Sequence, residues 1–508
     1  MARLRRFGTI GMGIVLGCAT LVLAGRPAAA TCDIPMVGTP TSTVYLPNVT
    51  KTLGGPTGWQ TPFIIQNTGT AATTIEVSFF RFSDGECITR RGATLAPGTS
   101  FADVPNNDAD LPGDTQFSVV VRSFGATIVG VVNEHAGVGA RAEALAYDGF
   151  NAGSTKVSLP NVTRRFFGFV TPIIIQNLGS DTTAASASFV SFDGTSTLTV
   201  NRTIAPGRSQ FIDPNSEPGL IDGKQYAVTI TSAQPIAVVE NAHNDAPAVA
   251  NPVAYATDGI SAGAAAVYAP YAAKNANGIG RLSTIVVQNV GTVATAPTLT
   301  FTPIAGSLGS VQTFASPSAI QPGASWAFDP RFDLGTTTPC AGPTATCLGD
   351  GEYSVVAASS TSVIAAVVNV ISPATAMGYT ASPKPDAKYF LPNVTRTLGG
   401  PSGWTTPILL QTVSAGGATL RWYRFSDGSL VTTQVLTVAA GTGIRIDPRD
   451  VAALSDDTQY AVVVNGTGGT VASIVIELAT GGDNAMIYEG FPASGQPALT
   501  SSATSAGR

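Results

Sequence analysis

Short stretches of alternating apolar and polar residues fill most of the chain. Ile75, Val77 and Phe79 alternate with polar neighbours, the period of two that is typical of a half-buried strand. Fully apolar, β-branched runs of three or four residues indicate central strands, and they lie at residues 63–65, 119–121, 129–132 and 173–175. Asp-Gly and Pro-Gly pairs between these runs mark turns. Since no stretch keeps a helical period, we predict an all-β chain.

Three landmarks recur in a fixed order. The motif LPNV occupies residues 46–49, 159–162 and 391–394, with an altered copy at 268–271. An apolar run then ends at a glutamine, and these are Gln66, Gln176, Gln288 and Gln411. An aromatic residue opens a later strand, at Phe117, Tyr226, Tyr353 and Tyr460. Self-similarity at a period of about 110–120 residues predicts four copies of one structural unit.

Each unit has turn signals every 8–12 residues and room for seven or eight strands, which is typical of an immunoglobulin-like β-sandwich. The third unit carries an insertion of about fifteen residues. We therefore predict four tandem immunoglobulin-like sandwiches, over residues 31–150, 151–261, 262–384 and 385–492, followed by a disordered tail at 493–508.

The landmarks resemble a known group of proteins. The order of an apolar strand with Gln-Asn-x-Gly, an Asp-Gly turn, Ala-Pro-Gly and Tyr-x-Val-x-Val resembles tandem bacterial secreted immunoglobulin-like repeats, including cell-adhesion-related domains. The resemblance implies an adhesive or spacing role and no catalytic residue. It also implies tyrosine corners at Tyr226, Tyr353 and Tyr460. Phe117 departs from the pattern because it has no hydroxyl.

Residues 1–30 have the pattern of a secretory signal peptide. Arg3, Arg5 and Arg6 precede an apolar stretch at residues 8–23, and Ala28–Ala30 supply a small-residue cleavage site. We expect a secreted or extracellular protein, either free or associated with the cell surface. A membrane anchor or a lipid on Cys18 is the alternative. No later segment has the ~18 apolar residues of a membrane helix, so we expect no membrane insertion after cleavage.

The low charge of the chain limits the classes of partner that we expect. Only 12% of the residues are charged and the formal net charge is −5, which gives no general attraction for nucleic acid or anionic lipid. We expect an extracellular polymer, a cell surface or another protein as the partner.

Four cysteines follow the leader. An even number in an exported protein favours disulfides. Cys340 and Cys347 lie close together within the insertion of the third unit, so we predict the pairs Cys340–Cys347 and Cys32–Cys87. A zinc site is the alternative, but the cysteine spacing matches no known zinc module.

The chain lacks the sequence signs of an enzyme. Zinc-protease, serine-hydrolase and nucleotide-binding motifs are absent, and the chain has two histidines, His135 and His243, which we expect at the surface. We expect no cofactor. Trp59 and Trp404, in GGPTGW and GGPSGW, are candidate sugar-stacking residues; the alternative is that each covers the core of its own sandwich.

Aspartates gather in loops after the Pro-Gly turns. They lie at residues 106–114, 213–222, 329–333 and 447–457. Weak calcium binding is one interpretation, and hydrogen bonding within Asx turns is the other. We predict a non-catalytic spacer or adhesin, in which serial sandwiches give length, with a carbohydrate-binding or enzyme-associated module as the alternative.

Overall fold

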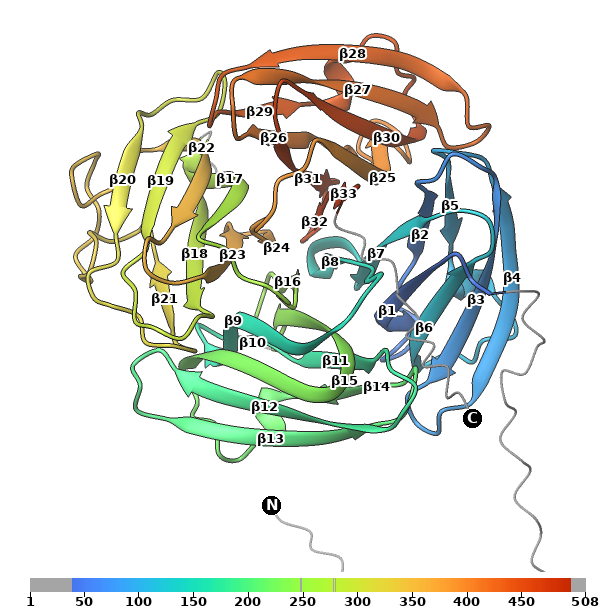
Figure 1. Cartoon of the computed structure of the whole chain (residues 1–508), viewed down its shortest axis with the longest axis horizontal. Coiled ribbons are helices and arrows are strands. Elements are labelled where there is room, and N and C mark those ends of the chain that lie inside the picture. Colours follow the sequence, from blue (N-terminus) through green and yellow to red (C-terminus); the bar gives the residue numbers. More distant parts are fainter. Residues whose placement is uncertain (1–38, 247–248, 277, 279, 495–508) are drawn as a thin grey trace, which may run out of the picture.

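The structure is a computed structural model that describes residues 39–246, 249–276, 278 and 280–494. Figure 1 shows four groups of strands arranged as a ring around a common centre. The described chain contains antiparallel sheets and short 3-10 turns but no α-helix, so the all-β prediction is confirmed. The predicted signal peptide, Cys32 and residues 495–508 of the predicted tail lie outside the described residues.

Two four-stranded sheets form the first group, which we call module 1. One has the order β1–β6–β3–β4 and the other β5–β2–β7–β8, so β1 and β2 lie in different sheets, unlike the first two strands of an immunoglobulin constant domain. The strands are β1 (Ser42–Lys51), β2 (Phe63–Asn67), β3 (Thr73–Arg81), β4 (Cys87–Leu95), β5 (Ser100–Asp103), β6 (Thr115–Ser123), β7 (Ile128–Ala136) and β8 (Glu143–Asp148).

The other three groups repeat this order. Module 2 comprises β9 (Ser154–Phe166), β10 (Phe169–Val170), β11 (Ile173–Asn177), β12 (Thr183–Ser191), β13 (Thr197–Ile204), β14 (Ser209–Ile212), β15 (Lys224–Asn244) and β16 (Val253–Asp258). Module 3 comprises β17 (Ala266–Ala276), β18 (Arg281–Asn289), β19 (Thr298–Pro303), β20 (Gln312–Ala315), β21 (Ser325–Phe328), β22 (Gly351–Ala358), β23 (Ile364–Ile371) and β24 (Ala376–Thr380). Module 4 comprises β25 (Lys388–Arg396), β26 (Ile408–Thr412), β27 (Gly416–Arg424), β28 (Leu430–Val438), β29 (Gly443–Ile446), β30 (Thr458–Thr467), β31 (Val471–Leu478), β32 (Ala485–Glu489) and β33 (Phe491–Pro492).

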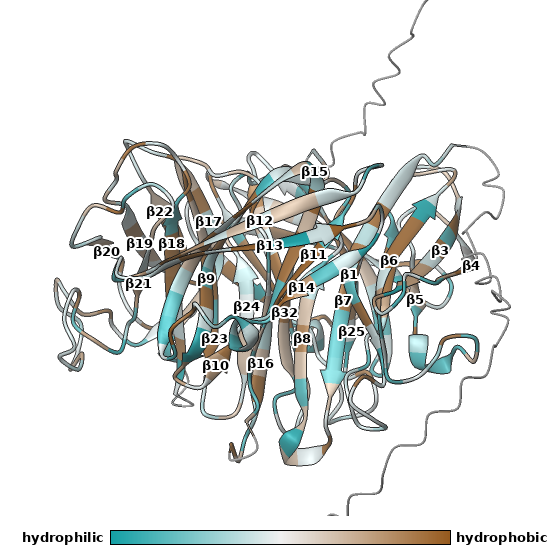
Figure 2. Ribbon diagram, turned by 90° about the horizontal axis from the view of Figure 1, so that it is seen from below, coloured by the Kyte–Doolittle hydropathy of each residue, from teal (hydrophilic) through white to brown (hydrophobic). Residues whose placement is uncertain are grey.

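The alternation in the sequence sets the faces of the strands. Ile75, Val77 and Phe79 of β3 are fully buried against the opposite sheet, while strand β2, an unbroken apolar run ending in Gln-Asn, is buried throughout. The Asp-Gly turns need glycine, because Gly85 has a φ of 73°, which side chains strongly disfavour. Figure 2 shows apolar residues on many of the strands between the outer loops.

The LPNV motif forms a β-bulge. The pairing of β1 with β6 shifts register between Leu46 and Val49, which accommodates a proline inside a strand. The hydroxyl of Tyr147, on β8, accepts a hydrogen bond from the Asn48 amide at 3.0 Å and donates to the Asn48 carbonyl. Tyr488 bonds to Asn393 in the same way. The bulge is therefore fixed to the innermost strand of its own module.

The expected tyrosine corners are formed. The Tyr226 hydroxyl accepts from the Ile221 amide at 2.7 Å, and that of Tyr460 accepts from the Ser455 amide at 2.8 Å. The hydroxyl of Tyr353 donates to the Gly349 carbonyl at 2.8 Å. Each bond reaches the backbone four or five residues upstream, where it holds the turn that precedes the strand.

The modules close on themselves instead of extending in series. The innermost strands β8, β16, β24 and β32 contact one another around the centre of the ring. Asp483, fully buried, accepts from the amides of Ala254 in module 2 and Ala376 in module 3, and its own amide donates to Ala142 of module 1. The expected gain in length from serial sandwiches is therefore not what the structure shows.

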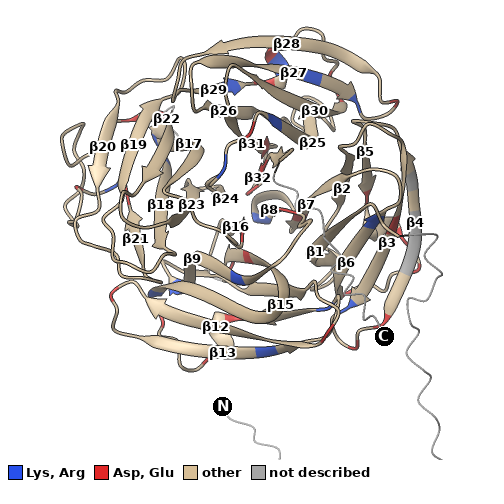
Figure 3. Ribbon diagram, in the orientation of Figure 1, with Lys and Arg blue, Asp and Glu red and all other residues tan. Residues whose placement is uncertain are grey.

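Charged residues are sparse over the ring (Figure 3). Among the described residues, no helix is long and apolar enough to span a membrane.

Candidate functional site

A cavity of about 460 Å³ lies at the seam between modules 2 and 3. Its size falls within the range of small-ligand sites, about 300–1,000 Å³. Strands β9, β10 and β16 contribute one wall, and β18, β21 and β23 contribute the other. We call it the 2–3 cavity; its walls include Asn161, Phe166, Phe167, Phe169, Gln225, Tyr255, Leu282, Ala327, Asp329, Arg331, Asn369 and Ile371.

At two other seams, a hydrogen-bonded glutamate and asparagine fill the positions that correspond to the wall of this cavity. At the seam between modules 1 and 2, the Glu134 carboxylate accepts from Asn48 Nδ2 at 2.9 Å and from Asn241 Nδ2 at 3.3 Å. At the seam between modules 4 and 1, Glu477 accepts from Asn393 and from Asn133, each at 2.9 Å. A buried glutamate of one module thus binds an asparagine of the next.

Burial changes the acidity of both glutamates. It raises the pKa of Glu134 to about 7 and that of Glu477 to about 8, although the asparagine amides oppose the shift. Transfer out of water penalises the charged carboxylate more than the protonated one. These side chains are structural elements of the seams.

The seam between modules 2 and 3 has a mismatched pair. The strand register places Ala242 where module 1 has Glu134, and Tyr255 where module 1 has Leu145. Asn369 of module 3 stands where Asn241 stands in module 2. At the remaining seam the equivalent pair, Val370 and Ile476, is apolar and lies in one continuous core.

Asn369 is therefore left without its glutamate. It is 4% exposed, and its Nδ2 donates no hydrogen bond among the described residues; its Oδ1 is buried without a partner, as are those of Asn133 and Asn241 at the seams that keep the glutamate. Across the cavity Asn161 accepts from Gln225 Nε2 at 2.9 Å, and in place of a glutamate it bonds to the hydroxyl of Tyr255. A buried amide without partners costs about 1–3 kcal/mol, which a ligand hydroxyl would recover.

Smaller side chains widen the same seam. Ala327 of β21 occupies the place of Phe211 in β14, since they pair with Val286 and Ile174 respectively. The equivalent cavity between modules 1 and 2, which Phe211 lines, is about 170 Å³. The difference between the two cavities follows from the loss of one phenyl ring and one glutamate.

Aromatic rings form the rim of the 2–3 cavity. Phe167 is 70% exposed and lies edge-on to Phe166, with ring centroids 4.6 Å apart. The Arg331 guanidinium of module 3 lies 5.4 Å from the centre of the Phe167 ring and forms an ion pair with Asp329. Deeper in the seam, Phe169 and Tyr255 pack at 5.7 Å.

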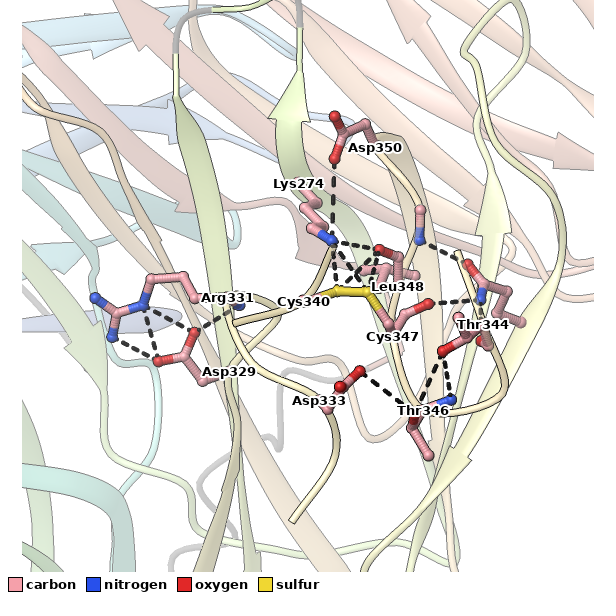
Figure 4. The surroundings of a disulfide bond; sticks show 12 residues. Lys274, Asp329, Arg331, Asp333, Cys340, Thr344, Thr346, Cys347, Leu348 and Asp350 are labelled. Atoms are coloured by element: carbon pink, nitrogen blue, oxygen red, sulfur yellow. Dashed lines mark hydrogen bonds and ion pairs between the residues drawn. A yellow bond between two sulfur atoms is a disulfide. The ribbon is translucent and has the colours of Figure 1, made fainter. Parts of the chain in front are cut away.

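The predicted disulfide Cys340–Cys347 is present and supports this rim (Figure 4). The Cys340 amide donates to the Arg331 carbonyl at 2.8 Å. Beside the disulfide, Lys274 Nζ donates to the Leu348 carbonyl at 2.5 Å, and burial lowers the pKa of Lys274. The insertion of module 3 thus fixes a residue of the cavity wall. The Cys32–Cys87 pair stays a prediction because Cys32 lies outside the described residues.

The structure places Trp59 and Trp404 at two other seams. Each is half-buried and packs edge-on against a histidine of the next module, Trp59 against His243 at 5.0 Å and Trp404 against His135 at 5.2 Å. Both also pack against the core of their own module. The expectation of surface histidines is wrong, because both rings are half-buried at seams, where burial lowers the pKa of His135 to about 4.

The loop aspartates mostly bond to their own surroundings. Asp213 and Asp447 accept from amides of the turns that follow them, each at 2.9 Å. Asp222 and Asp456 form ion pairs with Arg164 and Arg396. Within the described residues, the one group of three acids whose carboxylate oxygens converge, Asp148, Asp258 and Glu489, lies outside these loops.

Sequence reasoning missed the 2–3 cavity. The useful signal was the recurrence of LPNV, whose asparagines Asn48, Asn161 and Asn393 are all 4% exposed. An alignment of the strands that follow in each repeat would have set Glu134, Ala242 and Glu477 at equivalent positions.

Comparison with known proteins assigns the chain to no family. No family model matches the chain, and no curated protein matches it. Among solved structures, the crystal structure of Thermotoga maritima 1070 aligns with 22% of this chain and 96% of that chain, at 17% identity and a TM-score of 0.19.

Proposed function

We propose that the chain is a secreted, non-catalytic binding protein that holds a carbohydrate of a cell surface or extracellular polymer in the 2–3 cavity. The observation that carries the proposal is the buried Asn369 amide, which no glutamate binds and which lines the cavity together with the aromatic rings of module 2. Amides offer both donors and acceptors to hydroxyl pairs, and aromatic faces pack against the C–H faces of sugar rings. The signal-peptide pattern and the Cys340–Cys347 disulfide support secretion.

An adhesive role fits the ring better than a spacing role. Asn133 of module 1 bonds to Glu477 of module 4, so the ends of the module series meet and the molecule gains no reach. The 2–3 cavity needs both of its modules, and a single repeat would present half of it.

The test measures retention of the mature chain on cellulose, chitin, xylan and peptidoglycan. We expect retention by at least one polymer, a tenfold or greater loss in Ala327→Phe, and a loss of about tenfold in Asn369→Ala, because one hydrogen bond contributes about 1 kcal/mol or more. Ala327→Phe copies the Phe211 ring of the narrower seam. Ala102→Phe is the matched control, since Ala102 holds the same place in β5, opposite Ile64.

Two results would contradict the proposal. Retention by none of the polymers would refute carbohydrate binding. Retention that survives both cavity variants but disappears in Trp59→Ala or Trp404→Ala would move the site to the tryptophans.

A further inference from the structure

The last residues of the four innermost strands meet at the centre of the ring. β8 ends at Asp148, β16 at Asp258, β24 at Thr380 and β32 at Glu489. Strand register shows that these positions are equivalent, because they pair with Val131, Val239, Val367 and Ile474 respectively. Each module therefore places one oxygen-bearing side chain at the centre of the ring.

Three of these side chains are carboxylates in very close proximity. One oxygen from each of Asp148, Asp258 and Glu489 lies within 4.8 Å of the others. The Asp148 amide donates to Asp258 at 3.3 Å, and the Thr380 amide donates to Glu489. Among the described residues, no Lys or Arg forms an ion pair with any of the three acids.

The carboxylates face a space with further unpaired oxygen. A cavity of about 190 Å³ is lined by the three acids, Thr380 and Ser473. Ser473 is 4% exposed, and its Oγ has no hydrogen-bond partner among the described residues. Asp148 Oδ1 is also buried without a partner.

We propose that this axial cavity binds one calcium ion, which ties modules 1, 2 and 4 together. Calcium takes six to eight oxygen ligands at about 2.3–2.6 Å, so any two of its ligands stand at most about 5 Å apart, and the three carboxylate oxygens, all within 4.8 Å of one another, fit around one ion. Carboxylate and hydroxyl oxygens suit calcium, whereas zinc prefers nitrogen and sulfur. Magnesium demands a stricter octahedron than three carboxylates on separate strands provide.

The site is separate from the aspartate-rich surface loops and from the 2–3 cavity. None of the three acids lies in those loops, and none lines that cavity. Failure of carbohydrate binding would therefore leave this inference intact, and the reverse also holds.

The experiment titrates the full mature chain with CaCl2 by calorimetry at neutral pH after removal of metal with EDTA, and records the melting temperature with and without calcium. We expect one calcium per chain and a higher melting temperature with the ion. Asp258→Asn and Glu489→Gln should each weaken calcium binding tenfold or more. Asp447→Asn, in a surface loop, should bind as the wild type does, and MgCl2 should raise the melting temperature less than CaCl2.

Terbium luminescence keeps the test decisive if one variant folds poorly. Terbium replaces calcium at oxygen sites. Tyr379 and Tyr488 lie close enough to the site for electrostatic interaction of their phenol groups with Glu489 and Asp148, respectively. Tyrosine-sensitised emission should appear in the wild type, be displaced by calcium, and be lost in Asp148→Asn. A chain that shows no calcium response, or whose response is lost in Asp447→Asn instead, would overturn the proposal. A chain stabilised by acid alone would show that protons, and not calcium, neutralise the three acids.

Discussion

At the scale of single residues, Glu477 links two modules through a carboxyl group held out of water. Its pKa in the folded chain is about 8, against an ordinary value of 4.5. Between these pH values the folded protein keeps a proton that the unfolded chain has released. Stability contributed by this group is therefore complete at low pH, falls as pH rises from about 4.5 to about 8, and is constant above.

Glu477→Gln should remove this dependence. When the pH is raised from 5 to 9, the free energy of unfolding of the variant should rise by roughly 2–4 kcal/mol relative to that of the wild type, since one pKa unit corresponds to about 1.4 kcal/mol. Urea denaturation at both pH values measures the gain. Asp427→Asn is the control, because the pKa of that exposed carboxyl, about 2, lies below the window. An equal difference at both pH values would contradict the assignment.

At the scale of elements, the disulfide of the module 3 insertion connects stability with the binding site. Replacing Cys340 and Cys347 by serine should lower the free energy of unfolding by about 2–3 kcal/mol, the loop-closure value for so short a loop. Because the Cys340 amide holds the Arg331 carbonyl, the variant should also lose polysaccharide retention several-fold. Calorimetry and the retention assay measure the two effects. An unchanged melting temperature would show that the loop is ordered without the bond.

The strands and turns could be predicted from the sequence, whereas the surfaces through which the modules contact one another could not. The alternation at Ile75 and Val77, and the Asp-Gly turns, depend on neighbours in sequence, and the structure confirms an all-β chain on that basis. The 2–3 cavity depends on Ala242 and Asn369, which are far apart in sequence and come together only when module 2 is placed against module 3. Trp59 was a candidate sugar-stacking residue with core covering as the alternative; the structure packs it on the core of its own module and against His243 of another module, a contact that the sequence did not indicate.

At the scale of the whole molecule, apolar cores run across three of the four seams. One cluster joins module 1 with Ile174 and Val239 of module 2, and another joins Ile64 and Val129 of module 1 with module 4. The core of module 3 continues into Leu409 of module 4. At the seam between modules 2 and 3, by contrast, two small separate clusters take the place of a shared core. The ring therefore has one seam with less apolar burial than the rest, and it contains the cavity.

Hydrogen bonds across the ring follow the same pattern. Ser100 Oγ of β5 donates to the Pro392 carbonyl of module 4 at 3.0 Å, and Ser209 Oγ of β14 donates to the Pro47 carbonyl of module 1 at 2.9 Å. Ser325 holds the same place in β21, facing module 2, and its buried Oγ has no partner among the described residues. The seam between modules 2 and 3 thus lacks both the shared core and the serine bond.

Local opening should therefore begin at this seam. Regions with few shared apolar contacts and fewer hydrogen bonds open at lower free-energy cost than the rest of a fold. In native-state hydrogen exchange of the full chain, we expect amides of β21 to exchange faster than those of the equivalent strands β5 and β14, by roughly tenfold for each 1.4 kcal/mol of missing stabilisation. A polysaccharide fragment bound in the 2–3 cavity should slow β21 and leave β5 unchanged, because a ligand stabilises the closed form that it binds. Equal exchange in all three strands would mean that the mismatched pair of Ala242 and Asn369 is compensated elsewhere, and that the ring opens as a single unit.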